Sequence, residues 1–205
     1  MPKKSEEKRQ RIKQAALHVF AREGFAKARI SEIAKLAGVA DGTIYLYFKN
    51  KDDLLIRIFE EEMDAIIPRV RERVARGKTA YEKLGIFIES HFDLVESHPD
   101  LAMVLEVELR QSDTFIRTPL KVKFKEYLDI IAEIVEQGQS RGEIRPDVSA
   151  SVAKQVIFGA LDDISQNWLL RSPRKRRLSD FAPEVKRILL EGICSKRVAA
   201  EEECR

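Results

Sequence analysis

The sequence predicts an all-α fold of about nine helices. Only 9 of the 205 residues are glycine and 7 are proline, which argues against a turn-rich β fold. Leu, Ile, Ala, Glu, Lys and Arg dominate the composition, and the chain as a whole favours helices. Apolar residues recur at helical spacing, and no stretch alternates at a period of two for long enough to predict a strand.

Three helices are predicted near the N-terminus. Residues 6–22 form the first, and Gly24 follows where a C-terminal cap belongs. Two short helices, 31–37 and 41–48, come next, and Gly38 separates them. The apolar side chains that share one face of the first helix are Ile12, Ala15, Ala16, Val19 and Phe20.

Longer helices are predicted in the rest of the chain. Residues 51–76 form one helix, in which Pro68 predicts a kink. The capping-box pattern of Thr79 and Glu82 predicts a helix that ends near residue 97. Pro99 suits the first turn of the next helix, which is predicted to end near residue 110. The last three helices are predicted over residues 119–141 before Gly142, 147–170 with Asp147 as N-cap, and 179–196.

Charge divides the chain near residue 50. Residues 1–51 hold 12 Lys and Arg against 5 Asp and Glu, a net charge of +7, whereas the remainder holds 25 against 29. A basic segment on a mildly acidic body indicates a module that binds a polyanion, although a solvated basic tail would give the same charge. We therefore predict two domains, residues 1–50 and residues 51–205.

The two short helices have the spacing of a helix-turn-helix. Ala34 lets the second helix pack closely, Gly38 permits the turn, and Ile44 anchors the second helix on the first. Phe48, Ile33, Leu36 and Val39 are expected to complete this small core. An ordinary helical corner would need the same residues, so the basic charge of the segment is what favours DNA binding.

The exposed side of the second short helix then faces the major groove. Thr43 and Tyr45 are expected to donate to base edges or phosphates, and Gly42 leaves room for the DNA backbone. Tyr47, Lys49 and Lys51 are better placed for phosphates.

The segment IAKLAGVADGTIYLYFKNKDDL, residues 33–54, resembles the DNA-binding signature of TetR-type regulators. The resemblance implies a three-helix DNA-binding domain followed by a larger helical effector domain, over essentially the whole chain. This chain departs from the usual family pattern at Arg29, Ala40 and Leu46. The implied DNA-contacting positions are Arg29, Ser31, Asp41, Gly42, Thr43, Tyr45, Leu46, Tyr47, Lys49 and Lys51.

The resemblance also implies a homodimer that binds a palindromic operator of double-stranded DNA. In this family the last two helices, here 147–170 and 179–196, pair with a second subunit. Small residues on the first of them would permit close approach, or the same face could pack within its own chain. That face consists of Ala150, Ala153, Ile157, Ala160, Leu161 and Ile164.

The effector is expected to be a long-chain acyl-CoA, and no other cofactor is expected. Residues 91–112 and 157–168 resemble the acyl-CoA-responsive repressors of fatty-acid degradation within the TetR family. Basic residues could hold the CoA phosphates, and apolar residues could line a tunnel or be plain core. The candidate ligand-binding residues are Phe87, Phe92, Leu101, Leu105, Arg110, Arg117, Lys121, Phe124, Leu128, Phe158 and Trp168. Leu94, Ile131, Lys123, Lys125 and the run 174–177 are further candidates.

The expected function is a repressor of fatty-acid degradation genes that acyl-CoA releases from DNA. The alternatives are a TetR-type regulator of efflux or other metabolism that senses a different hydrophobic molecule, a binding module without an effector, and an enzyme. No catalytic residue set is visible, and residue 72 is Glu where a phosphate-binding loop ending at 77–79 would need glycine. His91 and His98 lack the partners of a metal site.

The remaining signals concern the compartment. Cys194 is expected to be a core residue and Cys204 to lie in a charged tail, with no disulfide framework. No apolar run is long enough to span a membrane, and the basic start leads into charge rather than into a signal peptide. We therefore expect a cytoplasmic protein.

Overall fold

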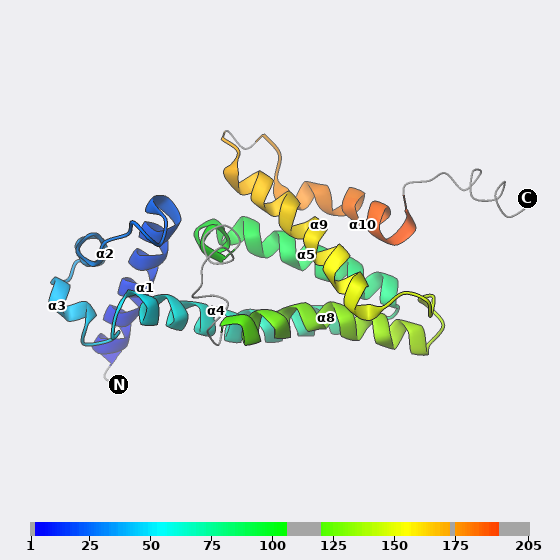
Figure 1. Ribbon diagram of the computed structural model, residues 1–205, viewed down its shortest axis with the longest axis horizontal. Helices are drawn as coiled ribbons and strands as arrows, with labels where there is room; N and C mark the ends of the chain where they lie inside the picture. Colours follow the sequence, from blue (N-terminus) through cyan, green and yellow to red (C-terminus); the bar gives the residue numbers. More distant parts are fainter. Residues whose placement is uncertain (1–2, 106–119, 173–174, 193–205) are drawn as a thin grey trace, which may run out of the picture.

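The computed structural model describes residues 3–105, 120–172 and 175–192, and these residues form helices and no strands. The predicted all-α fold is confirmed, with nine α-helices and one short 3-10 helix in the described ranges. A small N-terminal unit lies at the left of Figure 1. It consists of α1 (Lys3–Glu23), α2 (Ile30–Ala37) and α3 (Asp41–Ile44).

The long helix α4 (Lys51–Ala75) leads from this unit into the larger body (Figure 1). There α4, α5 and α8 pack on one another, and α9 crosses α5 and α8. The other elements of the body are α5 (Ala80–Ser97), α6 (Pro99–Ala102), α8 (Leu120–Ser140), α9 (Ala150–Leu170), η2 (Leu178–Phe181) and α10 (Ala182–Glu191).

Several predicted helix ends are confirmed. Gly24 and Gly38 follow α1 and α2 with φ of 79° and 65°, which a side chain with a Cβ adopts only at a cost. The Thr79 side chain accepts a hydrogen bond from the Glu82 N–H at 3.2 Å, and the Glu82 carboxylate accepts one from the Lys78 N–H. These local signals fix where α1, α2 and α5 end or begin.

Three predicted boundaries were wrong. The second helix of the motif stops at Ile44, and residues 45–47 form a turn, so it is shorter than 41–48. The helix expected from Asp147 begins at Ala150, because the Asp147 carboxylate pairs with Arg145 instead of capping a helix. The last helix begins at Ala182 rather than 179, because residues 178–181 form the 3-10 turn η2. The ends expected near 110 and 196, and both cysteines, lie outside the described residues.

The core of the N-terminal unit is built largely as predicted. Ile33, Ala34, Ile44 and Phe48 are all buried. Leu36 was expected to join them but is 54% exposed, because the buried side of α2 runs through Ile33, Ala34 and Ala37. Leu36 therefore belongs to the surface.

The buried apolar residues continue from this unit into the body, where α4, α5, α8 and α9 pack together. Its fully buried side chains include Phe87, Phe92, Ile131 and Leu161. In the described part of the chain, no helix is long and apolar enough to cross a membrane. Nor do the described residues hold a group of three or more His, Cys, Asp or Glu side chains placed to bind a metal.

Candidate functional site

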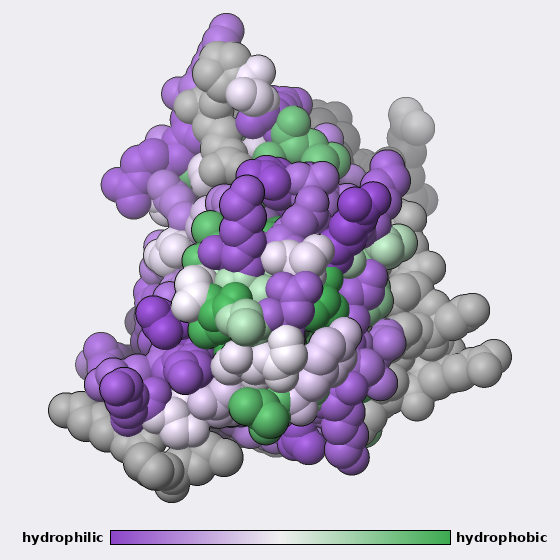
Figure 2. Space-filling view, turned by 90° about the vertical axis from the view of Figure 1, so that its left-hand side faces the viewer, coloured by the Kyte–Doolittle hydropathy of each residue, from purple (hydrophilic) through white to green (hydrophobic). Residues whose placement is uncertain are grey.

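The first candidate surface is the exposed end of the N-terminal unit, around α3. Leu46 is 82% exposed and Tyr45 is 56% exposed, while Asp41, Gly42 and Lys49 are also on the surface. Figure 2 views the molecule from this end, and shows hydrophobic residues in green set among hydrophilic residues in purple. An exposed helix end with polar, apolar and basic side chains can contact base edges and phosphates in a major groove.

Most of the predicted contact residues are accessible there. Thr43 and Tyr47 are half-buried, and the Tyr47 hydroxyl lies 3.2 Å from Ser5 Oγ on α1. Arg29 and Ser31 are exposed at the start of α2. The Glu32 carboxylate accepts a hydrogen bond from the Arg29 N–H at 3.4 Å. This backbone N–H at the start of α2 therefore has a side-chain acceptor, although the Arg29 side chain itself does not cap the helix.

Lys51 was expected to bind a phosphate, but in the structure its ammonium binds backbone carbonyl oxygens. Lys51 Nζ donates to the carbonyl oxygens of Phe25, Ala26 and Ala28 at 2.7, 3.2 and 3.1 Å. It also lies 4.7 Å from the centre of the Phe25 ring. The ammonium therefore ties the start of α4 to the turn after α1, with its donors already used.

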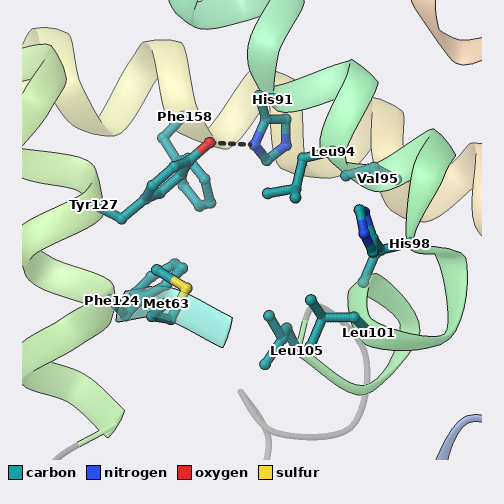
Figure 3. A pocket seen from close by; sticks show the side chains of 11 residues that line it. Met63, His91, Leu94, Val95, His98, Leu101, Leu105, Phe124, Tyr127 and Phe158 are labelled. Atoms are coloured by element: carbon teal, nitrogen blue, oxygen red, sulfur yellow. Dashed lines mark hydrogen bonds between the residues drawn. The ribbon is translucent and has the colours of Figure 1, made fainter. Parts of the chain in front are cut away.

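The second candidate site is an apolar pocket in the body, between α4, α5, α6, α8 and α9 (Figure 3). Its volume is about 50 Å³. His91, Tyr127 and Phe158 lie at one end in Figure 3, and Leu101 and Leu105 at the other. The lining residues are Met63, His91, Leu94, Val95, His98, Leu101, Ala102, Leu105, Phe124, Tyr127 and Phe158.

A buried polar network closes one end of this pocket. Tyr127 Oη lies 3.1 Å from His91 Nδ1, and Ser165 Oγ lies 3.4 Å from His91 Nε2. The three side chains are at most 4% exposed and come from α8, α5 and α9. The imidazole thus joins three helices around the pocket, because each ring nitrogen faces a hydroxyl.

The sequence placed some residues in the lining and missed others. Of the candidate ligand-binding residues, Leu101, Leu105, Phe124 and Phe158 line the pocket, as does Leu94. Sequence reasoning missed Met63, His91, Val95, His98, Ala102 and Tyr127 as lining residues. A His and a Tyr on apolar helix faces were the available signal; His91 opened the segment 91–112 that resembles acyl-CoA-responsive repressors, but as a single side chain it was weighed only as a metal ligand.

Five aromatic or aliphatic candidates lie outside the pocket lining, among them Ile131, which is fully buried in the core. Phe87 and Phe92 are fully buried in the core, and the Phe87 ring packs 5.3 Å from the Tyr127 ring. Leu128 is partly buried against the core. The Trp168 indole N–H donates to the Arg176 carbonyl at 2.8 Å, which fastens the end of α9 to the following turn.

The basic candidates are scattered, and several are already paired. Lys121 is exposed on α8, whereas Lys123 Nζ pairs with Asp64 at 2.7 Å and Lys125 pairs with Asp129 at 2.6 Å. Arg110, Arg117 and Arg174 lie outside the described residues.

Two members of the basic run 174–177 have structural partners, and one of them, Arg176, donates to the Asp180 carbonyl at 3.0 Å. Arg177 pairs with Glu96 at 2.9 Å. Burial alone would raise the pKa of Glu96, but the hydrogen bonds from Arg177 and Ser179 outweigh it and lower that pKa. This pair therefore joins η2 to α5.

The face of α9 proposed for dimerisation is turned partly inwards. Ile157 and Leu161 are buried within their own chain, so the alternative of intrachain packing holds for them. The side of α9 that is free carries Val152 and Val156, which are 56% and 58% exposed. On α10, Ile188 is 46% exposed.

Besides the contacts of Lys51, two polar links join α1 to the pocket helices α4 and α6. The Glu61 carboxylate on α4 binds Arg9 and Lys13 of α1, the latter at 2.6 Å. Burial by itself would raise the pKa of Glu61, but hydrogen bonds from these two cations lower it. His18 Nδ1 on α1 lies 2.9 Å from Asp100 Oδ2 on α6.

Comparison with known proteins identifies family matches for both parts of the chain. Residues 12–58 match the model of "Bacterial regulatory proteins, tetR family". Residues 59–192 match the model of "YsiA-like protein, C-terminal region". The chain is 40% identical over 194 residues to the fatty acid metabolism regulator protein of Bacillus subtilis, covering 95% of this chain and 100% of that protein.

Solved structures of fatty-acid regulators share the fold of this chain. The transcriptional regulator FadR from Bacillus subtilis in complex with stearoyl-CoA superposes with a TM-score of 0.83 at 40% identity, over 90% of this chain and 99% of that one. The fatty acid degradation regulator FadR from Bacillus halodurans gives 0.85 at 37% identity, over 92% and 97%.

Proposed function

We propose that this chain, which belongs to the tetR family of bacterial regulatory proteins, is a DNA-binding repressor of fatty-acid degradation genes that long-chain acyl-CoA releases from operator DNA. The observation that carries the proposal is an apolar pocket whose lining includes residues of α4 and α6. Both of these helices pack against α1 of the N-terminal unit. The relative bound to stearoyl-CoA shares this fold over nearly its whole length. This function is not enzymatic.

On the DNA side, two copies of α3 would enter successive major grooves of a palindromic operator. The two subunits would pair through the free side of α9 and through α10, where Val152, Val156 and Ile188 leave apolar surface uncovered. Because a two-fold dimer presents its two reading surfaces at a fixed separation, a change in that separation would release the DNA.

On the ligand side, the pocket must open to accept an acyl chain. Its volume of about 50 Å³ is far below the roughly 300–1,000 Å³ typical of ligand pockets. Leu101 and Leu105 must therefore move relative to Met63 on α4. Because Asp100 of α6 holds His18 of α1, and α4 directly follows the helix-turn-helix, the N-terminal unit would be displaced as well.

The energetic condition is that acyl-CoA binds the open form better than the form that fits the operator. We expect saturating stearoyl-CoA to weaken operator binding by about 5- to 150-fold, the usual range for such coupling. The measurement is fluorescence anisotropy with an operator obtained by in vitro selection on the purified chain. Unchanged operator affinity at saturating stearoyl-CoA would contradict the proposal.

Native mass spectrometry on protein from a bacterial host tests the stoichiometry independently. A dimer mass that carries bound acyl-CoA supports both the dimer and the effector. Release of the operator by a neutral hydrophobic molecule, with no response to acyl-CoA, would favour a regulator of efflux instead.

A further inference from the structure

Leu46 is the most exposed large hydrophobic side chain in the part of the chain that the structure describes. It is 82% exposed, whereas Ile44 and Phe48, two positions before and after it, are 1% and 2% exposed. It directly follows α3, which lies at the end of the molecule farthest from the body (Figure 1). Because the two buried side chains anchor the backbone on either side, the leucine side chain between them points into solvent.

The backbone that carries Leu46 is held by hydrogen bonds. The Leu46 N–H donates to the Thr43 carbonyl at 3.2 Å. The N–H groups of Tyr47 and Phe48 both donate to the Ile44 carbonyl at 3.0 Å. The position of the leucine is therefore set before any partner arrives, and binding through it needs little further ordering of the chain.

Gly42 leaves open space on the same helix, four residues before Leu46. A Cβ atom at Gly42 would meet no neighbouring atom within 4 Å, and the residue does not adopt a positive φ. Neither packing nor backbone conformation therefore requires glycine at this position, and glycine inside a helix is less favourable than alanine. The missing side chain is useful only to a partner that closely approaches α3.

The surroundings of Leu46 suit duplex DNA better than an apolar protein surface. Residues 1–51 carry 12 Lys and Arg against 5 Asp and Glu. Lys49 is exposed, and no carboxylate of the described residues lies within ion-pair distance of its ammonium. Leu46 is thus a single apolar group on a basic surface, rather than part of the contiguous patch that marks a protein interface.

A leucine can contact one kind of group favourably among the base edges of a major groove. Those edges present hydrogen-bond donors, acceptors and the C5-methyl group of thymine. The leucine side chain neither donates nor accepts, so against a polar edge it would displace water without replacing the lost hydrogen bond. Against the thymine methyl, both partners lose apolar surface to water, which is favourable.

We propose that Leu46 recognises the C5-methyl group of a thymine at a fixed position in each half-site of the operator. The inference rests on the DNA-binding part of the proposed function and deepens it, because it assigns one base to one side chain. It is independent of the effector.

The test removes the methyl group from the DNA and the leucine from the protein. An operator obtained by in vitro selection on the full-length chain is remade with deoxyuridine in place of thymidine, one symmetric pair of positions at a time. Deoxyuridine pairs with adenine as thymidine does but lacks the methyl group. Fluorescence anisotropy would measure the Kd of each duplex for the wild type, Leu46→Ala, Tyr45→Ala and Leu36→Ala. Leu36 is the matched control, since it is a 54% exposed leucine on α2 of the same unit.

We expect one symmetric replacement to raise the wild-type Kd about fourfold per half-site, or about 15-fold for the palindrome, which is the effect of one buried methyl group at each contact. Leu46→Ala should bind the thymidine duplex more weakly and distinguish the two duplexes by less than about twofold. Leu36→Ala should distinguish them as the wild type does. Because Leu46 is so exposed, its alanine variant should keep the Tm of the wild type within about 2 °C.

Three results would overturn the inference. The first is a wild-type Kd that no deoxyuridine replacement changes by more than about twofold. The second is full discrimination between the two duplexes by Leu46→Ala. The third is discrimination that disappears in Tyr45→Ala and persists in Leu46→Ala, since it would assign the methyl contact to Tyr45. Failure to select any operator would overturn the proposed function itself, and it would be seen before any thymidine is replaced.

Discussion

Replacing Lys51 by methionine should destabilise the fold and spare the electrostatics of DNA binding. Methionine keeps an unbranched apolar stem but removes the ammonium that three carbonyl oxygens share. Hydrogen bonds to a charged group are worth about 1.5–3 kcal/mol, and the contact with the Phe25 ring about 0.5–1 kcal/mol. The three bonds come from one ammonium and are not additive, so we expect a loss of about 2–3 kcal/mol.

For a chain of this size each kcal/mol lowers the Tm by about 2–4 °C, so Lys51→Met should melt about 4–12 °C below the wild type. Circular dichroism at matched protein concentrations would measure this, because dimerisation makes the Tm depend on concentration. The control is Lys49→Met, which removes an exposed ammonium two residues earlier. Its Tm should stay within about 2 °C of the wild type.

The two variants should behave in the opposite way on DNA. If Lys49 binds a phosphate in each subunit, its loss should reduce the slope of log K against log salt by about 2 per dimer. Lys51→Met should leave that slope unchanged when it is measured well below its Tm. A normal Tm together with a reduced slope in Lys51→Met would refute the structural role argued for this ammonium and restore a phosphate contact.

Three further predictions concern base reading, pH and the pocket. Thr43→Ala should relax sequence preference at one base pair of each half-site by about 1 kcal/mol, and in vitro selection that returns an unaltered operator would exclude this role. Glu61→Gln should lower the free energy of unfolding by about 1–3 kcal/mol, because Lys13 is buried against this carboxylate. The lowered pKa of Glu61 means that its contribution is present above the ordinary value of 4.5 and is lost as the pH falls through the folded-state pKa. Urea titrations of wild type and variant should therefore converge in acid, and a difference that grows in acid would contradict this sign. Leu105→Trp should fill the pocket and cost about 1–3 kcal/mol in stability. It should keep the operator affinity but abolish the release of DNA by stearoyl-CoA. Release at the same stearoyl-CoA concentration as in the wild type would show that the acyl chain binds elsewhere.

Features that depend on neighbouring residues were predictable from the sequence. Gly24 and Gly38 marked helix ends because only glycine takes their backbone angles at no cost. Thr79 marked a helix start because a cap acts within one turn. The motif of residues 33–54 was equally local, and it identified the family before any packing was known.

Features that depend on distant residues were decided by the tertiary structure. The carbonyl acceptors of Lys51 lie 23 to 26 residues away, so its spacing beside α3 was consistent with a phosphate contact until the chain was folded. The pocket likewise joins Met63, His91 and Tyr127 from three helices, which no periodicity within one helix could bring together. Periodicity gave α9 an apolar face, and only packing decided that Ile157 is buried while Val156 is exposed. The sequence by itself thus determined the fold and the family, because helix spacing and capping are local. The tertiary structure alone decided which charged side chains link distant parts of the chain and which lie on its surface, because ion pairing and burial depend on residues distant in sequence.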